Sequence, residues 1–202
     1  MLTLAGMKIL SKILLTLAAT AALSCATPTF ANIVVNGGFE TGNFAGWGQQ
    51  GNTGFTGVGT LSPTGVGPHS GSFLAYFGAI GSDGGINQNL VTNAGNTYNL
   101  SFWLANDTLN APSDFSLMWN GATIYSVVDP GPSGYTLFTF NNLLATGALT
   151  SLQFNFRQDP AYFELDDVLV NSAPDGGNTL WLLGLAMVGI CLIRRWAPAS
   201  AK

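Results

Sequence analysis

Apolar and polar residues alternate along several short runs of this chain, and β-strands are the elements that have a period of two. The alternation is clearest in residues 98–105, which read YNLSFWLA, and in residues 152–157, which read LQFNFR. Successive side chains of a strand point to opposite faces, so one face of each run is expected to be buried. Residues 32–171 contain no convincing amphipathic-helix pattern. The sequence therefore predicts an all-β domain.

Turn-forming residues separate these two runs from other predicted strands. Gly, Asn, Pro and Ser recur between short apolar segments, and Asn120-Gly121 predicts a tight hairpin because both residues tolerate positive φ. About nine strands without helical crossovers favour an antiparallel β-sandwich. The remaining strands are expected at residues 33–36, 72–79, 86–91, 115–120, 122–128, 135–142 and 162–170.

The first 31 residues have the layout of a secretory signal peptide. Lys8 and Lys12 precede an apolar run over residues 13–23, and small residues follow as far as Ala31. The apolar run is too short to span the ~30 Å hydrocarbon core of a bilayer as a helix. We expect export and cleavage after Ala31. The alternative is a lipoprotein signal that ends at Cys25.

The segment expected to follow the cleavage site, residues 32–172, has no cysteine and a strongly acidic balance. The two cysteines of the chain, Cys25 and Cys191, lie outside it, so disulfides and cysteine chemistry are excluded there. The segment has nine Asp and Glu residues and one Lys or Arg residue, Arg157, so its net charge is −8. Nucleic-acid binding needs clustered Lys and Arg to displace phosphate counterions, so this partner is excluded as well.

The composition changes abruptly after Ser172. A breaker-rich motif is followed by the apolar run 180–193, which covers about 21 Å as a helix, and then by two arginines. Basic residues tend to stay on the cytoplasmic side of a membrane. We predict a C-terminal transmembrane helix, and the alternative is a buried terminal helix of the globular domain. The residues that define the tail are Pro174, Asp175, Gly176, Gly177, Arg194 and Arg195.

This combination of motif, helix and Arg pair resembles a PEP-CTERM-type sorting signal of the subclass with a Val-Pro-Asp-Ser-Gly motif. Ala173 stands where Val is usual, and Gly176 stands where Ser is usual. The resemblance implies processing by exosortase, a membrane-embedded cysteine protease, in a Gram-negative bacterium that makes exopolysaccharide. It further implies membrane anchoring, at least transiently, and then a place at the cell surface or in the extracellular matrix. The expected parts are a signal peptide (1–31), an ectodomain (32–172) and a sorting tail (173–202).

Both ends of the ectodomain resemble those of galactose-binding-like jelly rolls, a group that includes carbohydrate-binding modules. The opening segment 32–40 (NIVVNGGFE) with Gly46-Trp47, the segment 69–72 (HSGS) and the closing segment 163–168 (FELDDV) carry this resemblance. It implies a jelly-roll sandwich of about 140 residues.

In many related modules the first strand, the following loop and the last strand meet around one structural Ca²⁺. The resemblance therefore implies a calcium site at the matching positions, and oxygen donors of these types suit that hard cation. The alternative is that Glu40 and Asp166 are surface or hydrogen-bonded acids, one of them paired with Arg157. The implied ligands are the Gly38 carbonyl, the Glu40 carboxylate, a backbone carbonyl near Ser72, and Asp166.

The non-core faces of the two alternating runs suggest a glycan-binding surface. Sugars stack on aromatic rings while planar polar side chains hold their hydroxyl groups. Trp103 lies on one such face, and Gln153, Asn155 and Arg157 lie on the other, so neighbouring strands would join them into one surface. The alternative is that a loop covers Trp103 and that Arg157 pairs with an acid. Two further tryptophans, Trp47 and Trp119, are expected in the core or at strand edges.

Catalytic signals are weak. Asp166 and Asp167 are adjacent, so on a regular strand they would point to opposite faces and could not cooperate as an acid–base pair. His69 is the single histidine of the chain, and it is expected to be solvated in its loop. No nucleophile elbow is visible. We therefore expect a non-catalytic surface or matrix protein associated with exopolysaccharide or the envelope, with a glycan-binding module as the alternative and a hydrolase as the last choice.

Overall fold

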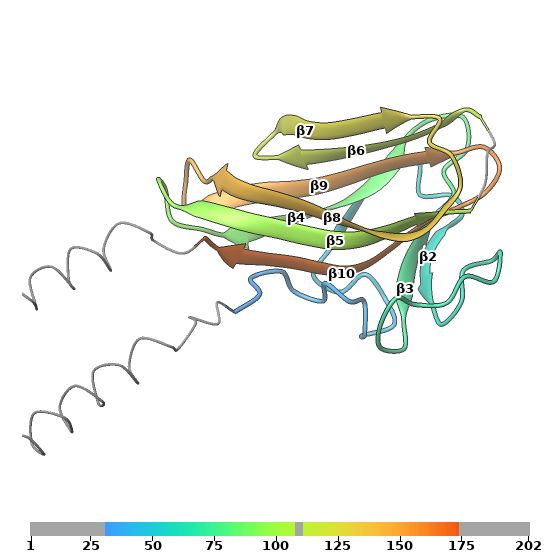
Figure 1. The fold of residues 1–202 in the computed structure, drawn as a ribbon, viewed down its shortest axis with the longest axis horizontal. Coiled ribbons are helices and arrows are strands. Elements are labelled where there is room, and N and C mark those ends of the chain that lie inside the picture. Colours follow the sequence, from blue (N-terminus) through green and yellow to red (C-terminus); the bar gives the residue numbers. More distant parts are fainter. Residues whose placement is uncertain (1–30, 108–110, 174–202) are drawn as a thin grey trace, which may run out of the picture. The chain divides into compact units, whose positions relative to one another are not determined.

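The computed structural model describes residues 31–107 and 111–173. These residues form ten β-strands in two five-stranded sheets, which pack as two layers (Figure 1). The predicted signal peptide, the Cys25 alternative and the sorting tail from Pro174 to Arg195 lie outside the described residues. Within the described part of the chain, no helix is long and apolar enough to cross a bilayer.

The two layers have interleaved connections. Sheet A has the strand order β1-β4-β9-β6-β7, sheet B has the order β2-β3-β10-β5-β8, and each strand pairing is antiparallel. The predicted antiparallel sandwich is confirmed. Sheet A contains β1 (Gly48–Gly51), β4 (Gly84–Val91), β6 (Ser113–Trp119), β7 (Ala122–Val128) and β9 (Leu149–Gln158); sheet B contains β2 (Thr56–Gly59), β3 (Leu74–Phe77), β5 (Thr97–Asn106), β8 (Ser133–Leu144) and β10 (Phe163–Ser172).

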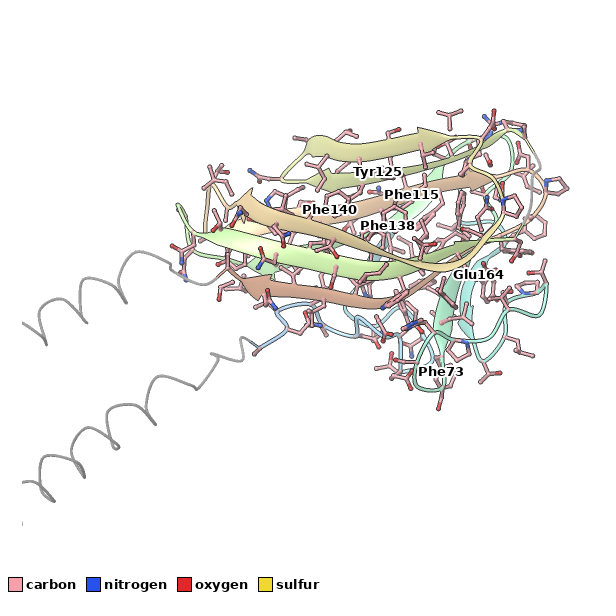
Figure 2. The ribbon with its side chains drawn as sticks, in the orientation of Figure 1. Phe73, Phe115, Tyr125, Phe138, Phe140 and Glu164 are labelled. Carbon is pink, nitrogen blue, oxygen red and sulfur yellow. The ribbon has the colours of Figure 1, made fainter. Side chains whose placement is uncertain are left out.

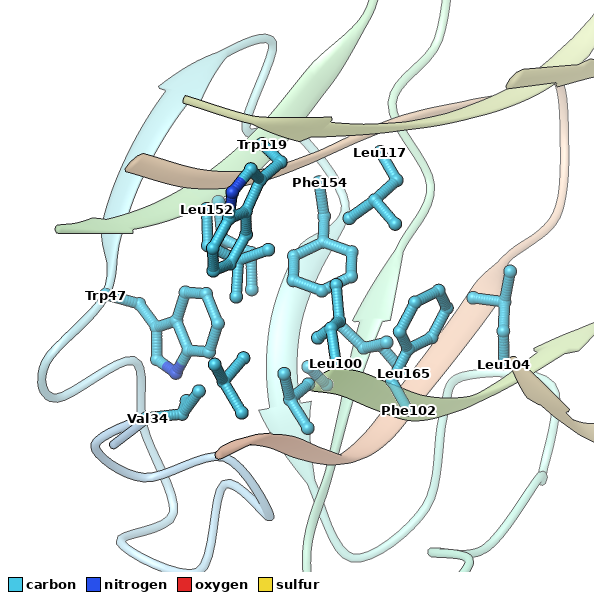
Figure 3. Close-up of a cluster of buried hydrophobic side chains, with 14 of the residues drawn as sticks. Val34, Trp47, Leu100, Phe102, Leu104, Leu117, Trp119, Leu152, Phe154 and Leu165 are labelled. Carbon is cyan, nitrogen blue, oxygen red and sulfur yellow. The ribbon is translucent and has the colours of Figure 1, made fainter. Parts of the chain in front are cut away.

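Aromatic rings fill the space between the sheets. Phe102 of β5 meets Phe154 of β9 edge to face at 5.1 Å between ring centroids, and Phe77 of β3 stacks on Phe156 of β9 at 4.0 Å. These contacts join opposite sheets, and the rings are fully or almost fully buried (Figure 3). Burying such a ring stabilises the fold by about 1.5–3 kcal/mol. The alternating faces of β5 and β9 therefore bind the two layers together.

A second group of rings extends the core toward β7 and β8. Phe138 and Phe140 of β8 pack against Tyr125 of β7, with centroid distances of 5.4 and 6.0 Å, and Phe115 of β6 lies beside them (Figure 2). The expected packing of Trp47 and Trp119 is confirmed, because both side chains belong to the buried core. The indole N–H of each donates to a backbone carbonyl, of Asn36 and Leu144 respectively.

The hairpin predicted at Asn120-Gly121 is confirmed. Asn120 has φ = 52° and Gly121 has φ = 80°, and the flanking residues Trp119 and Ala122 pair across β6 and β7. Two positive φ values in a two-residue loop match the right-handed twist of the strands that it joins.

Three details of the predicted strand list are wrong. Residues 33–36 form turns instead of a strand, because Asn36 adopts φ = 55° and redirects the chain after Ile33 has bonded to Val170. The short strands β1 and β2 lie in a Gly-rich stretch for which no strand was predicted. Their sequences, GQQG and TGVG, have no apolar alternation, and they form because they pair with β4 and β3.

Candidate functional site

The outer face of sheet A carries a network of side-chain amides that spans four strands. The Gln50 amide nitrogen donates to Asn155 Oδ1 at 2.9 Å, and Gln153 donates to the same oxygen at 2.8 Å. Asn87 donates to Gln50 Oε1 at 3.0 Å, and Asn155 donates to Ser116 Oγ at 3.0 Å. The network thus connects β1, β4, β9 and β6 through one central amide.

Strand register explains why these side chains meet. Gly85 of β4 lies opposite Gln50 on one side and opposite Asn155 on the other. Since Gly85 has no side chain, the two amides can reach each other across the strand between them. Asn155 lies directly opposite Ser116 on β6, and Gln153 lies directly opposite Asn87 on β4. The amide face is hereafter the set Gln50, Asn87, Ser116, Gln153 and Asn155.

The amide face is chemically suited to hold hydroxyl groups. Each carboxamide has two N–H donors and an oxygen with two lone pairs, so a side chain bonded to its neighbour keeps further positions for a ligand. The five residues are half-buried, which fixes their orientation while leaving part of each group accessible to solvent. A rigid array of neutral donors and acceptors is the chemistry with which pockets fix polar ligands.

Charged groups lie beside the amide face at the Arg157 end of β9. Arg157 donates to Asp159 Oδ2 through two nitrogens, at 2.9 and 3.2 Å, and this hydrogen bond raises the pKa of the guanidinium. The expected pairing of Arg157 with an acid is thereby confirmed. Partial burial raises the pKa of Asp114, which lies opposite Arg157 on β6; Asp83 raises that pKa further, and Arg157 lowers it.

Trp103 does not join Gln153, Asn155 and Arg157. Trp103 lies on β5 of sheet B, whereas the other three lie on β9 of sheet A, so their outward faces are on opposite sides of the sandwich. The single aromatic-plus-polar surface suggested by the sequence is therefore not formed. The alternative prediction for Trp103, that a loop covers it, is confirmed, because His69 stacks on its ring at 3.9 Å with an interplanar angle of 16°.

His69 is exposed, as expected, but it also stacks on Trp103, and its Nδ1 lies 2.7 Å from Asp167 Oδ2. The prediction that Asp166 and Asp167 of β10 diverge is wrong, because Asp167 adopts φ = 50° where the register of β10 shifts, and both carboxylates reach residues 69–70. Ser70 Oγ donates to Asp167 Oδ1, so the hydroxyl is bonded to the carboxylate and not to the imidazole.

The structure brings the four predicted calcium ligands into one region. A Cβ placed on Gly38 would lie 3.7 Å from Glu40 Cγ and 3.9 Å from Asp166 Oδ1, and the Ser72 N–H donates to the Glu40 carboxylate at 2.9 Å. Backbone N–H groups of His69 and Ser70 bind Asp166 Oδ2.

These hydrogen bonds match the alternative that Glu40 and Asp166 are hydrogen-bonded acids, although Arg157 pairs with Asp159 and not with either of them. Burial is the main cause that raises the pKa of Asp166, to about 6, although the N–H groups of Ser70 and Asp167 lower it. Among the described residues, no group of three or more His, Cys, Asp or Glu side chains could hold a metal ion. A site here would rest on two carboxylates and neutral oxygens, and calcium stays a prediction.

Sequence reasoning missed part of the amide face. Gln50 lies outside the predicted strands, and Ser116 and Asn87 lie on predicted strands but were not among the predicted site residues. The alternation of residues 86–91 carried a usable signal, since it places Asn87 on the face opposite Ile86.

Comparison with known proteins places the fold among carbohydrate-binding modules and adhesin domains. No family model and no curated protein matches the sequence. TmCBM61, solved in complex with β-1,4-galactotriose, gives a TM-score of 0.58 at 19% identity, over 71% of this chain and 99% of that one. The CBM22-1 xylan-binding domain of Paenibacillus barcinonensis Xyn10C gives 0.50 at 16% identity, over 73% and 97%.

A third similar structure is the K3 cleaved adhesin domain of Lys-gingipain from Porphyromonas gingivalis, with a TM-score of 0.52 at 17% identity, over 70% of this chain and 100% of that one. At these identities the likeness shows the fold and leaves the ligand open. The described chain is an antiparallel β-sandwich of the jelly-roll type seen in carbohydrate-binding modules, as predicted.

Proposed function

We propose that this chain is a non-catalytic glycan-binding module whose ligand lies on the amide face of sheet A. The observation that carries the proposal is the amide network itself, in which Gln50 and Gln153 both donate to Asn155 and the three side chains form one array of donors and acceptors. Two structures of the same fold are named as a complex with a galactotriose and as a xylan-binding domain, and this supports a carbohydrate ligand.

The surface argues for binding without turnover. Amide side chains do not ionise near neutral pH, so the amide groups of this face cannot act as a general acid or base. The acids nearest to it, Asp114 and Asp159, lie around Arg157, and Asp159 is held in a hydrogen-bonded ion pair. We assign the amide face to recognition.

Affinity electrophoresis in gels that contain soluble polysaccharides tests this function. The panel should include a β-galactan, a xylan and the exopolysaccharide of the producing bacterium. Wild-type protein is expected to be retarded by at least one of them. Asn155→Ala is expected to weaken retardation about tenfold, since it removes the central amide and about 1.4 kcal/mol of hydrogen bonding.

Thr139→Ala is the matched control, because Thr139 is an exposed polar residue of β8 in the other sheet. It should bind like wild type, and melting curves of both variants should show that the fold is kept. Unchanged retardation of Asn155→Ala, or a wild type that no polysaccharide retards, would contradict the proposal.

The place in which this module acts is also a proposal. The predicted signal peptide and sorting tail fit an exported protein that exosortase processes and that reaches the cell surface. A surface module that binds polysaccharide would then be held where the exopolysaccharide of the cell accumulates.

A further inference from the structure

Glu164 of β10 is fully buried, yet neither of its carboxylate oxygens has a hydrogen-bond partner. Its neighbours Phe163 and Leu165 belong to the core between the sheets, so the Glu164 side chain lies on the outer face of sheet B. It is drawn where β10 passes β3 (Figure 2). A buried carboxyl group without a partner is costly to ionise, so it either keeps its proton or gains a compensating group.

Oxygen-bearing side chains surround this carboxyl group. Asp107, at the end of β5, and Ser62, in the segment that connects β2 to β3, are both close enough to change the Glu164 pKa. Burial is the largest cause, and together with Asp107 it raises that pKa to about 9, while Ser62 lowers it. Thr64 connects Asp107 with Ser62, because its hydroxyl donates to Asp107 Oδ2 and lies 2.9 Å from Ser62 Oγ.

Tyr135 of β8 completes the surroundings. Its hydroxyl is also buried without a partner. Tyr135 lines one pocket with Ala105 and Asp107, and Ala105 lies directly opposite Glu164 on the neighbouring strand. Burial raises the Tyr135 pKa, and the nearby acids raise it further. Two buried oxygen groups that lack partners thus lie among acids on the outer face of sheet B.

We propose that Glu164, Asp107, Ser62 and Tyr135 bind a calcium ion, at a site distinct from the one predicted at Glu40 and Asp166. The donors are all oxygens, which suits a hard cation, and the two carboxylates match its double positive charge. Calcium accepts six to eight oxygens in flexible geometry, so hydroxyls and water can complete the shell. Magnesium demands a stricter octahedral geometry and usually keeps several waters, so calcium is the ion proposed.

The ion would join four elements that are far apart in sequence, one of which is β8 with Tyr135. Ser62 belongs to the segment 60–73 that covers this face of sheet B, whereas Asp107 ends β5 and Glu164 lies within β10. Binding at this point would hold the covering segment on the sheet and give the buried oxygens of Glu164 a partner. The inference does not depend on glycan binding by sheet A.

Calcium titration of the full chain after removal of metal with EDTA tests the proposal. Calorimetric titration of wild type should show a site that Glu164→Gln weakens at least tenfold, and Asp107→Asn should weaken the same site. Glu40→Gln is the matched control, since it removes one carboxylate of the other predicted site and should leave this one intact. Terbium luminescence excited through tyrosine gives a local readout, because Tyr135 lies beside the proposed ion.

Folding of the variants is not expected to obscure the result. The amide of Glu164→Gln has nearly the shape of the carboxyl group and carries no charge, so this variant should melt no lower than metal-free wild type. The proposal is overturned if Glu164→Gln and Asp107→Asn bind calcium and sensitise terbium like wild type. It is also overturned if wild type takes up no calcium, or only calcium that Glu40→Gln abolishes.

Discussion

Burial raises the pKa of the Glu164 and Asp166 carboxyl groups, so both ionise at a higher pH than they would in the unfolded chain. The Glu164 pKa rises from 4.5 to about 9, and the Asp166 pKa rises from 3.8 to about 6, with burial as the largest cause in each case. A raised pKa means that the folded state binds the proton more tightly than the unfolded state does. The resulting stabilisation is complete below the ordinary pKa and is lost as the pH rises through the folded value.

We therefore expect the free energy of unfolding of the metal-free chain to fall between pH 4.5 and about 9. Urea unfolding at a series of pH values, followed by tryptophan fluorescence, measures this slope. Glu164→Gln should flatten the upper part of the profile, since the amide does not titrate. Stability that rises with pH over this window would show that Glu164 ionises freely in the fold.

Single residues were predicted unevenly from the sequence. Trp47 and Trp119 were correctly expected to pack, and Arg157 was correctly given an acidic partner as the alternative. His69 is exposed as expected, but its stacking on Trp103 was not predicted, because it depends on a contact between residues 34 positions apart, which no local pattern records. Side chains whose surroundings come from their own strand can be predicted, whereas those whose surroundings come from a distant loop cannot.

At the scale of elements, the β6–β7 hairpin offers a clean test of backbone strain. Gly121 has φ = 80°, and a Cβ placed on it would have no neighbour within 4 Å. Gly121→Ala should therefore destabilise the chain by about 1 kcal/mol through its backbone conformation alone. Chemical unfolding measures the loss.

Gly134 of β8 provides the control for this hairpin variant. A Cβ there also has open space, but its φ is not in the left-handed region. Gly134→Ala should leave the free energy of unfolding nearly unchanged or raise it slightly, because alanine restricts the unfolded chain. Equal destabilisation by the two variants would mean that positive φ is not the cause.

Some strands could be predicted from the sequence and others could not. β5 and β9 contain the alternating runs 98–105 and 152–157, and both strands were predicted. β1 and β2 have only four residues each, rich in glycine, and they were missed. Their stability comes from pairing with β4 and β3, so the information lies in the partner strands.

The assignment of strands to sheets is a property of the whole molecule and was not predictable. β5 and β9 look alike in sequence, yet they lie in opposite layers. Which strands pair is decided by contacts across long stretches of chain, and period-two patterns say nothing about these. For this reason the amide face was found only in part, and Trp103 was placed on the wrong side of the sandwich.

Calorimetric melts with EDTA and with excess Ca²⁺ test metal binding at this scale. An ion that binds only the folded chain raises the melting temperature by mass action. We expect a higher midpoint in calcium, and we expect Glu40→Gln to reduce the shift if the site at Gly38, Glu40, Ser72 and Asp166 is filled. An identical midpoint in EDTA and calcium would remove that prediction.

Mass spectrometry of the mature protein tests the predicted export and tail processing together. We expect an N-terminus at Asn32 and a C-terminus close to the motif at Pro174–Gly177. A chain recovered from the cytosol with Met1 and Lys202 still present would contradict both predictions.

The ends of the described domain leave it from one side. Ile33 bonds to Val170 near the end of β10, and Ala173, just beyond β10, bonds to Thr97 at the start of β5. β9 runs the other way and ends at Gln158, on the far side of the sandwich (Figure 1). A tether that continued from Ala173 would therefore lie on the side of the domain away from the Arg157 end of the amide face. If the amide face binds a glycan as proposed, this end would be the part of the face farthest from the tether.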